Sequence, residues 1–582
     1  MFAPLVSLRA ARARFACLFV AAGLLVCTSP SDSQTVTANF GSRSGSTPAV
    51  PAGLFSIGGA GSTVSASGPL GTLTTAGLNR TRFWIPLSQV YANKTPNFSY
   101  LDRTLETMKA AGLHPLAVIY DTPASLASST CEPPSDIWQW GQMAAAVVAH
   151  VDEKFPGLLQ DYEIWNEPEL AASLCISNAT TRLNTYVSMF AEAAAAMHKQ
   201  AEADGETIRT GGPVISQLSQ ASTWIPALLK NSSAAPYVDF VSFHLYVTGQ
   251  TNIDSGMTWS QLYAITQSTR GLAAYYKQIE TLVRSGYQPN AASTPIYITE
   301  FNDNWAYAVD CCRNDPTYGS LWNTVAIADF LNVVYSGANA VPSQLSYFNS
   351  AGSYFCILGQ WNETMNCDTS ATDPYPQYYA YKLFASPDYL DLQAGGNMAA
   401  SVSPANTTWG LNATAFYTSA ADDVVIINPT STSYSSVAVN LTNTGLSSLS
   451  GTEYLLNRSN GQISSWGIKL YSTSSGYWAT LDVPAYSTVA LSVKGGSTAE
   501  ALKAVLSVST KSGTHPLAVS ISSSESQGTI VGRTITFGDG TWLSWADSTT
   551  HTYTKPGSYF VGLTVKNASG QYSSTGTTIT VR

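Results

Sequence analysis

The chain has 582 residues, which is too long for one ordinary domain and leaves room for a large catalytic domain with smaller attachments. Only 11% of the residues are charged, and 28 Lys and Arg stand against 37 Asp and Glu. This sparse and acidic balance argues against a nucleic-acid partner, whereas the many aromatic and hydroxyl side chains suit a neutral, hydroxyl-rich ligand.

The first 33 residues have the pattern of a secretory signal peptide. Arg9, Arg12 and Arg14 precede an apolar run over residues 15–26, which is too short to span a membrane comfortably. We therefore expect a secreted or periplasmic protein without a membrane span, whose mature chain begins near residue 34. Cys27 offers an alternative, a lipid anchor, although the preceding valine is bulkier than that cleavage usually accepts.

Six cysteines follow the leader. In an exported protein they are more typical of disulfides than of metal ligands, and none has the paired spacing of a zinc site. All six fall in loops after predicted strands. The favoured bridges join Cys131 to Cys175 and Cys356 to Cys367, and the adjacent pair 311–312 stays unassigned. We expect no metal and no cofactor.

Strand-like and helix-like segments alternate between residues 53 and 349. The expected strands are 53–57, 80–85, 115–120, 158–165, 208–214, 238–246, 296–301 and 344–349. The amphipathic stretches between them are 100–111, 137–154, 181–203, 261–285 and 321–336. Because each parallel crossover needs a helix to carry the chain back, this order predicts an α/β fold, a (β/α)8 TIM barrel, over residues 34–391.

The rest of the chain is predicted to be all-β. Residues 392–494 read as short alternating strands separated by Asn, Gly and Ser turns, which is typical of a β-sandwich, and residues 495–498 as a linker. Residues 499–582 contain Phe537-Gly538-Asp539-Gly540 and, further on, the run 551–559, and this segment resembles the PKD domain. The resemblance implies an immunoglobulin-like module that acts either as a spacer or as a contact to glycans or surfaces.

Two of the predicted barrel strands end in a glutamate. One apolar run leads directly into Asn166, Glu167 and Pro168, and a second, alternating run leads into Glu300. Proline cannot donate to a strand ladder, so the first strand must end here, and the carboxyl ends of barrel strands are where such folds carry their chemistry. Two carboxylates are the minimum for glycoside hydrolysis, one as proton donor and one as nucleophile or base.

This pair resembles clan A of the glycoside hydrolases, through Trp165-Asn166-Glu167-Pro168 after the fourth strand and Glu300 after the seventh. With the trailing sandwich, residues 49–494 look most like glycoside hydrolase family 39. The resemblance implies a retaining enzyme for β-linked oligo- or polysaccharides, with Glu167 as acid/base and Glu300 as nucleophile. It predicts carboxyl groups about 5 to 5.5 Å apart.

The proposed chemistry also assigns roles to neighbouring residues. Burial and the charge of its partner should raise the pKa of Glu167, since the acid must hold a proton. Asn166 would bind the sugar's 2-hydroxyl, Tyr246 would donate a hydrogen bond to Glu300, and His244 would position Glu167 or the leaving group.

Four further residues are candidates for substrate contact because they lie at or after strand ends: Trp165, Asp121, Asn302 and Trp305. We assign Glu163 instead to the barrel interior, as a structural carboxylate paired with Arg82.

Three other functions remain compatible with the sequence. An endo-acting glucanase, mannanase or xylanase of the same clan, or a transglycosylase, would use the same two glutamates. A non-catalytic glycan-binding protein would be favoured if the two carboxylates proved to be far apart or walled off.

Overall fold

The computed structural model describes residues 34–582 apart from 44–46, 59–68, 94, 249–256, 269–270, 286–290, 305–316, 349–356, 358–373, 406–409, 447–448, 457–461, 496–502, 527–529, 545–546 and 568–571. The predicted leader, most of the linker, Trp305, the pair 311–312 and the bridge between Cys356 and Cys367 therefore lie outside the described residues.

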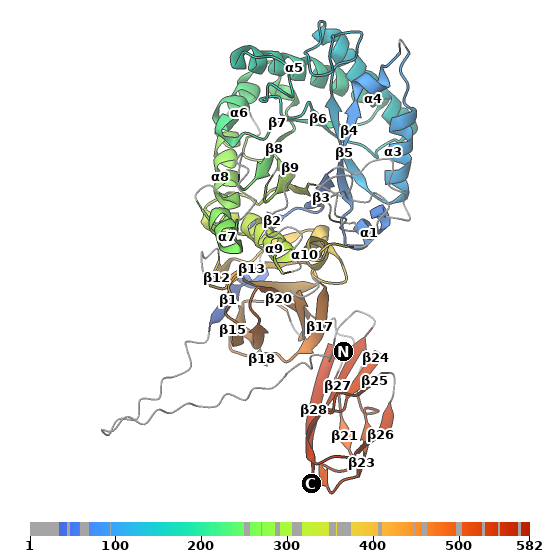
Figure 1. Cartoon of the computed structure of the whole chain (residues 1–582), viewed down its shortest axis with the longest axis vertical. Coiled ribbons are helices and arrows are strands. Elements are labelled where there is room, and N and C mark those ends of the chain that lie inside the picture. The colour runs from blue at the N-terminus through green and yellow to red at the C-terminus, as the bar shows by residue number, and fades with distance from the viewer. Residues whose placement is uncertain are drawn as a thin grey trace, which may run out of the picture.

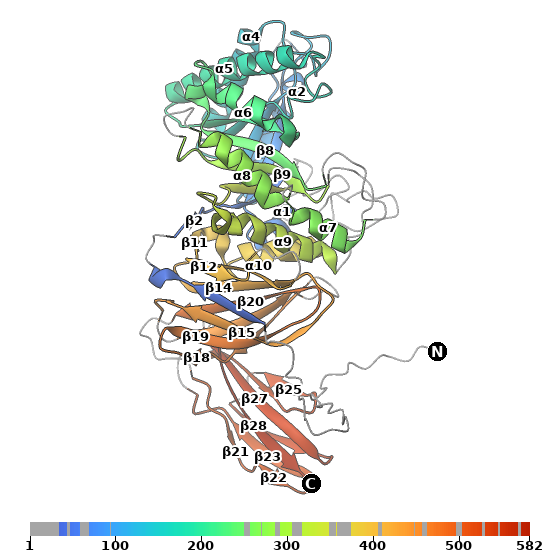
Figure 2. The ribbon, with the colours of Figure 1, turned by 90° about the vertical axis from the view of Figure 1, so that its left-hand side faces the viewer.

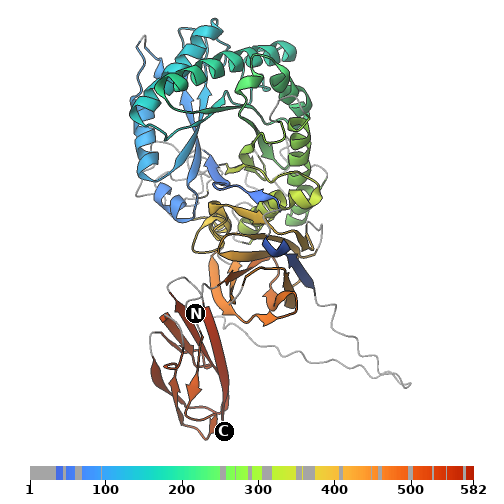
Figure 3. The ribbon, with the colours of Figure 1, turned by 180° about the vertical axis from the view of Figure 1, so that it is seen from behind.

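Three folded units follow one another along the long axis of the molecule (Figure 1). A barrel ringed by helices occupies one end, a two-sheet sandwich lies against it, and a small all-β module occupies the other end. The views from the side and from behind show the same order (Figures 2 and 3).

Eight parallel strands close into the predicted barrel. They are β3 (Phe55–Gly58), β4 (Arg80–Pro86), β5 (His114–Tyr120), β6 (Asp161–Ile164), β7 (Arg209–Ile215), β8 (Phe240–Tyr246), β9 (Ile296–Asn302) and β10 (Gln344–Tyr347). Both faces of these strands are largely buried, which explains their nearly continuous apolar runs. Arg82 and Glu163 are two of the buried charged exceptions on these strands, and they form the predicted ion pair, with 2.6 Å between Nε and Oε2.

Helices surround the barrel (Figure 1). They are α1 (Pro69–Thr75), α2 (Leu87–Val90), α3 (Ser99–Ala110), α4 (Ile137–Lys154), α5 (Ala179–Asp204), α6 (Ala221–Lys230), α7 (Trp259–Thr266), α8 (Leu272–Val283), α9 (Tyr318–Leu331) and α10 (Pro376–Ala385). The expectation of one helix over 261–285 is wrong. At Gly271 the chain passes so close to the end of α7 that a Cβ would lie 1.8 Å from the carbonyl oxygen of Thr266, so the chain turns there and begins a second helix.

The sandwich packs two sheets together. One has the order β17-β16-β20-β14-β13-β11-β2 and the other β12-β1-β15-β19-β18. These strands are β1 (Thr35–Asn39), β2 (Ala49–Val50), β11 (Gly396–Met398), β12 (Ser401–Ser403), β13 (Asn412–Tyr417), β14 (Ala421–Asn428), β15 (Tyr434–Thr442), β16 (Leu449–Leu456), β17 (Ile463–Ile468), β18 (Tyr471–Ser472), β19 (Gly476–Val483) and β20 (Ser487–Gly495).

The predicted start of the barrel at residue 34 is wrong, because the first two strands belong to the sandwich. Strand β1 runs parallel to β15, and its alternate residues Val36 and Ala38 are fully buried in the sandwich core. Their burial there explains why the first strand leaves the barrel domain and completes the neighbouring one.

Buried hydrogen bonds join the sandwich to the barrel. The indole of Trp259 donates to the carbonyl of Pro429 at 2.7 Å, and Asn332 Nδ2 donates to the carbonyl of Ala413 at 2.9 Å. The two domains therefore share one apolar core across this face.

The C-terminal module has its own apolar core and two sheets, with the orders β21-β23-β26 and β22-β28-β27-β24-β25. Its strands are β21 (Ser507–Val508), β22 (Ser512–Gly513), β23 (Leu517–Ser522), β24 (Ile530–Thr536), β25 (Trp542–Ser544), β26 (Ser548–Tyr553), β27 (Gly557–Asn567) and β28 (Tyr572–Val581). The prediction of an all-β immunoglobulin-like module is confirmed.

One predicted disulfide lies within the described residues and is confirmed. Cys131 and Cys175 are bonded, and the amide of Cys175 also donates to the carbonyl of Cys131 at 2.8 Å. The bridge ties the loop after β5 to the loop after β6. None of the described helices has the length and apolar character needed to cross a membrane.

Candidate active site

Glu167 stands on a tightly constrained turn at the carboxyl end of β6. The strand ends at Ile164, and both Trp165 (φ 68°) and Glu167 (φ 46°) have left-handed backbone conformations, which are uncommon for residues other than glycine. The amide of Glu167 donates to the carbonyl of Val214 at 3.1 Å. Val214 itself has φ 58°, a strained value for a β-branched residue. Neighbouring strand β7 thus fixes the backbone that presents this glutamate.

An irregularity in β9 brings Glu300 and His244 onto the same face. Phe243 pairs with Ile298, but His244 pairs with Glu300, so Thr299 is passed over. In regular alternation Ile298 and Glu300 would share a face. The shift instead turns Glu300 toward the barrel centre, level with His244.

Two donors, one of them on the fully buried Arg82, hold the carboxylate of Glu300. Arg82 Nη1 donates to Oε1 at 2.7 Å, and the Tyr246 hydroxyl donates to Oε2 at 2.7 Å, as predicted for Tyr246. Burial, together with the adjacent Glu300 carboxylate, raises the pKa of Tyr246 well above its ordinary value, so the phenol remains a donor. The side chain of Glu300 is only 7% exposed, so its charge is balanced by protein groups rather than by water.

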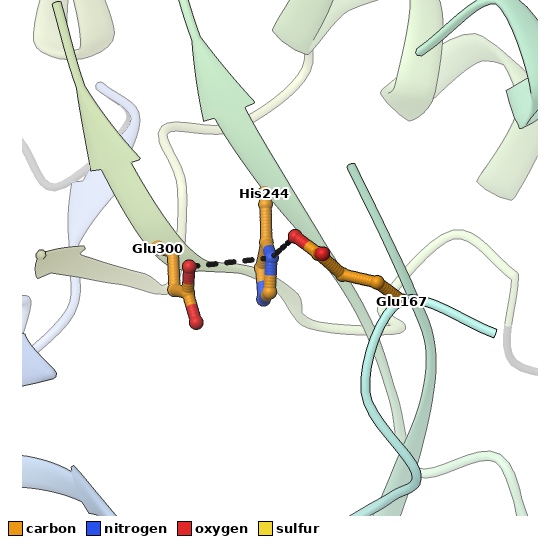
Figure 4. Close-up of side chains that lie close together, drawn as sticks. All are labelled: Glu167, His244 and Glu300. Carbon is orange, nitrogen blue, oxygen red and sulfur yellow. Dashed lines mark hydrogen bonds and ion pairs between the residues drawn. The ribbon is translucent and has the colours of Figure 1, made fainter. Parts of the chain in front are cut away.

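His244 lies between the two glutamates (Figure 4). Its Nδ1 is 2.8 Å from Glu167 Oε1 and 3.5 Å from Glu300 Oε2, and the ring is fully buried. Nε2 has no hydrogen-bond partner among the described residues, so the ring acts on the site through Nδ1. An oxygen of each carboxylate and the imidazole nitrogen lie within 4.8 Å of one another.

The pKa of Glu167 departs from its ordinary value in the direction opposite to our prediction. Burial alone raises it, but the hydrogen bond from His244 and the charges of His244 and Arg82 outweigh burial, and the net pKa is lowered. For His244, burial lowers the pKa, whereas the charge of Glu300 and the bond to Glu167 raise it above its ordinary value overall. The prediction failed because it counted burial and Glu300 but no cation beside the acid.

Arg82 is a site residue that sequence analysis assigned only to Glu163. Each of its three nitrogens has a different acceptor: Nε donates to Glu163, Nη1 to Glu300 and Nη2 to Asn166 Oδ1, the last at 2.9 Å. Asn166 is half-buried, so its side chain remains partly accessible. An arginine within a predicted barrel strand, directly before the apolar run 83–86, was the available signal.

Two half-buried aromatic rings adjoin this network at the ends of β4 and β5. Trp84 lies over the guanidinium of Arg82, with 5.2 Å from Cζ to the ring centre, and meets Tyr120 edge to face at 4.9 Å. Trp84 alternates in phase with Arg82 along β4, a pattern that would have indicated a shared face. Sequence analysis missed both rings.

Three of the residues predicted to contact substrate make contacts within the protein instead. Trp165 is fully buried against Trp140 and Tyr120, because the left-handed turn directs it into the core. Asp121 is 6% exposed and accepts hydrogen bonds from the amide and hydroxyl of Ser88. Burial raises the pKa of Asp121.

Asn302 is 1% exposed and bonds internally, with Nδ2 donating to the carbonyl of Phe348 at 2.7 Å and Oδ1 accepting from the amide of Asp303 at 2.8 Å. Like Trp165 and Asp121, it therefore supports the framework of the site.

Among the described residues, the one group of carboxylate and imidazole side chains close enough to surround a metal ion is Glu167, His244 and Glu300. Both oxygens of Glu300 already accept hydrogen bonds, and Arg82 already supplies a positive charge beside it. Protein groups account for this trio, and we assign no ion to it.

Comparison with known families matches two parts of the chain. The model for glycosyl hydrolases family 39 matches residues 88–444, and a PKD domain model matches residues 503–581. A beta-xylosidase of Geobacillus stearothermophilus is 24% identical over 250 residues, which are 40% of this chain and 45% of that enzyme. The chain thus spans less than half the length of that relative.

Solved structures share the architecture. A bacterial orthologue of human α-L-iduronidase has a TM-score of 0.58 at 14% identity, covering 94% of this chain and 99% of that chain. A monomeric beta-xylosidase of Caulobacter crescentus has a TM-score of 0.55 at 14% identity, covering 80% of this chain and 100% of that chain. A GH30 endoxylanase of Clostridium papyrosolvens has a TM-score of 0.53 at 17% identity, covering 80% and 100%. Identities this low establish the fold alone.

Proposed function

The chain belongs to glycosyl hydrolases family 39 and is a glycoside hydrolase, and from that premise we propose that it cleaves β-linked O-glycosides with retention of configuration. Glu300 is the proposed nucleophile and Glu167 the proposed acid/base. The observation that carries the proposal is the approach of one oxygen from each carboxylate to within 4.8 Å. Retaining enzymes place these groups about 5 to 5.5 Å apart, whereas inverting enzymes leave about 6.5 to 9.5 Å for a water molecule.

The proposed reaction is a double displacement. Glu300 attacks the anomeric carbon and forms a glycosyl ester, while Glu167 gives its proton to the departing oxygen. Glu167 then takes a proton from water, whose oxygen attacks the same carbon and releases Glu300. Arg82 and Tyr246 hold Glu300 at both oxygens, which restricts the nucleophile to one orientation.

His244 supplies the proton for the first step in this scheme. The raised pKa of His244 and the lowered pKa of Glu167 favour the proton on the imidazole side of their 2.8 Å hydrogen bond. Transfer along that bond makes Glu167 the acid and leaves a neutral imidazole. Esterification of Glu300 removes the negative charge that favours the imidazolium form of His244. In the second step Glu167 acts as a base.

The described part of the site favours a neutral sugar. Arg82 has every nitrogen engaged with Glu163, Glu300 or Asn166, so it is not available to pair with a carboxylate of a substrate. Trp84 and Tyr120 add half-buried aromatic rings of the kind that pack against sugars. Together with the beta-xylosidase relative, this favours a β-xyloside.

Two variants test the roles of the glutamates on a nitrophenyl β-xyloside. Glu300→Gln should abolish turnover. In Glu167→Gln we expect a loss of about 10² to 10⁴-fold in steady-state turnover. The activated leaving group needs little protonation, so Glu167→Gln should still release one equivalent of nitrophenol in a burst.

The exposed Glu202→Gln on α5 is the matched control and should behave as wild type. Proton NMR of the first-formed sugar tests stereochemistry, and an inverted product would refute Glu300 as nucleophile. If no aryl glycoside or xylan is cleaved while polysaccharide is bound, the catalytic proposal fails. The lengths of products from xylan separate terminal from internal cleavage.

We propose further that the chain is exported and that the PKD module contacts the polysaccharide. Trp542 on β25 and Phe560 on β27 are 65% and 60% exposed, and both lie in the five-stranded sheet. Exposed aromatic rings on a sheet suit a glycan surface. Trp542→Ala should reduce retention on insoluble xylan without changing hydrolysis of a soluble aryl glycoside. N-terminal sequencing of protein from the periplasm or medium tests cleavage of the leader.

A further inference from the structure

The outer face of the five-stranded sheet in the sandwich carries a row of side chains that the proposed mechanism does not use. The strand register places Ser403, Thr37, Asn440, Trp478 and Tyr471 side by side across β12, β1, β15, β19 and β18. The residues that alternate with them on these strands form the core of the sandwich, so the row points outward. Each residue of the row is exposed or half-buried.

An aromatic pair forms one end of the row. The rings of Tyr471 and Trp478 are stacked, with 4.6 Å between their centres and 19° between their planes, and Tyr471 is 39% exposed. Lys469 Nζ lies 4.6 Å from the centre of the Tyr471 ring. Because Tyr471 covers one face of the indole, the other face of Trp478 is directed along the row toward Asn440, its neighbour on β15. The pair thus forms a supported aromatic wall beside the polar part of the row.

The polar side chains of the row have hydrogen-bonding capacity that the protein does not use. Among the described residues, the hydroxyls of Ser403 and Thr37 and the amide of Asn440 have no hydrogen-bond partner. The same is true of the indole N–H of Trp478 and the phenol of Tyr471. Hydroxyl and amide groups both donate and accept, as the hydroxyls of a sugar do. The row can therefore form new hydrogen bonds to a sugar without breaking any within the protein.

The charges beside the row suit a neutral ligand. No residue of the row is charged, and the two charged side chains that flank it have opposite signs. Lys469 lies over the ring of Tyr471, and Asp482, further along β19, accepts the amide of Ser436 at 2.9 Å. This face consequently offers no net attraction to an acidic polymer and places no unpaired charge against a neutral one.

We propose that this row binds a neutral polysaccharide chain, at a site separate from both the active site and the PKD module. A pyranose has C–H bonds on its faces and hydroxyls around its rim. One sugar can therefore pack against the open face of Trp478 while its hydroxyls bond to Asn440 and Thr37. Neighbouring strands are about 4.8 Å apart, so the row extends roughly 14 Å from Trp478 to Ser403 and contacts more than one sugar of an extended chain.

Such a site would hold the enzyme on its polymer between catalytic events. A second attachment to the same chain raises the local concentration of bonds at the active site without any new contact there. The choice of xylan as the polymer rests on the proposed function, whereas the contacts described here require only a neutral chain.

Fluorine NMR of the full chain labelled with 5-fluorotryptophan tests the site directly. The Trp478 resonance is identified by its loss in Trp478→Phe. In the Glu300→Gln background, which prevents cleavage, xylohexaose should move this resonance in a saturable way. Asn440→Ala removes one hydrogen-bonding group, and Tyr471→Ala removes the ring that supports the indole. Each should raise the Kd measured at Trp478 about 3 to 10-fold.

Trp466 is the matched control. It is 41% exposed and lies on β17 in the other sheet of the same domain. Its resonance, identified by its loss in Trp466→Phe, should not move with xylohexaose. Trp466→Phe should also leave the Kd measured at Trp478 unchanged.

Three results would overturn the proposal. The first is a Trp478 resonance that xylohexaose does not move, and the second is a stronger response to an acidic oligogalacturonate. The third is a resonance that moves with protein concentration in the absence of sugar, since a second copy of the chain would then cover this face. The readout does not depend on turnover. A saturable shift without xyloside hydrolysis counts against the proposed function only, and hydrolysis with an unmoved resonance counts against this site only.

Discussion

Asp423 on β14 gives a stability prediction whose sign depends on pH. Its side chain is fully buried on the same strand face as Val425 and Ile427, in the core shared by sandwich and barrel. Burial raises the pKa of Asp423 to about 8, from an ordinary 3.8, and the charge of neighbouring Asp422 adds to this, whereas Ser492 opposes it. The folded protein therefore retains a proton at Asp423 at pH values where the unfolded chain has lost it.

The sign follows from the number of protons bound in each state. Below about pH 4 Asp423 is protonated in both states and contributes no pH dependence. Between about pH 4 and pH 8 the unfolded chain binds fewer protons, so each pH unit lowers the free energy of unfolding by about 1.4 kcal/mol. From pH 4 to pH 6 the expected loss is about 3 kcal/mol, an upper estimate for one site in a relaxing protein.

Asp423→Asn removes this dependence because asparagine does not titrate. The variant carries a constant offset from its buried amide, so the informative quantity is how its melting temperature relative to wild type changes with pH. That difference should rise between pH 4 and pH 6 by on the order of 5 °C. Asp388→Asn, an exposed carboxylate near the same interface, should show no such change. If the Asp423→Asn difference is equal at both pH values, Asp423 is paired or hydrated in solution and the reasoning is wrong.

Three further perturbations probe the barrel. Arg82→Lys keeps the charge, but the lysine side chain cannot reach three acceptors. We therefore expect kcat/KM to fall at least about 10²-fold and the free energy of unfolding to fall by about 3 kcal/mol. The control Arg80→Lys, at the other end of β4, should leave kcat/KM near wild type. Tyr246→Phe removes a hydrogen bond to a carboxylate worth about 1.5 to 3 kcal/mol, so kcat/KM should fall roughly 10 to 100-fold, and an unaltered rate would contradict its role. Replacing Cys131 and Cys175 by serine opens a disulfide-closed loop with a sequence separation of 44. The free energy of unfolding measured in urea should fall by up to about 4 kcal/mol. An unchanged unfolding midpoint would show that other contacts hold the loops.

The barrel could be predicted from sequence because its signals are local. Most of the barrel strands contain an apolar run, and each of the two glutamates lies at or after the end of a predicted strand. The same local logic placed Tyr246 and His244, which share a face because they are two residues apart on β8. It failed for β1, whose place in the sandwich depends on pairing with β15, about 400 residues away in sequence.

Side chains at strand ends were predicted less well because their direction depends on backbone irregularities. Trp165 was expected at the mouth of the site, but its left-handed φ sends it into the core. Asn302 and Asp121 have the polar character of ligand contacts, but internal donors and acceptors use their atoms. The residue type indicates that a side chain can bind a ligand, whereas only the fold shows whether its polar atoms already have partners within the protein.

The pKa of Glu167 illustrates the remaining step from position to chemistry. Burial and a second carboxylate both argue for a raised pKa, and the sequence contains both. The pKa of Glu167 is instead lowered, because Thr299 is passed over in the β8–β9 register and His244 lies level with Glu300. The charge of Glu300 favours the imidazolium form of His244, which hydrogen-bonds to Glu167. A shift of one residue in one strand therefore brings an imidazole beside both carboxylates, and regular alternation along β9 cannot predict it.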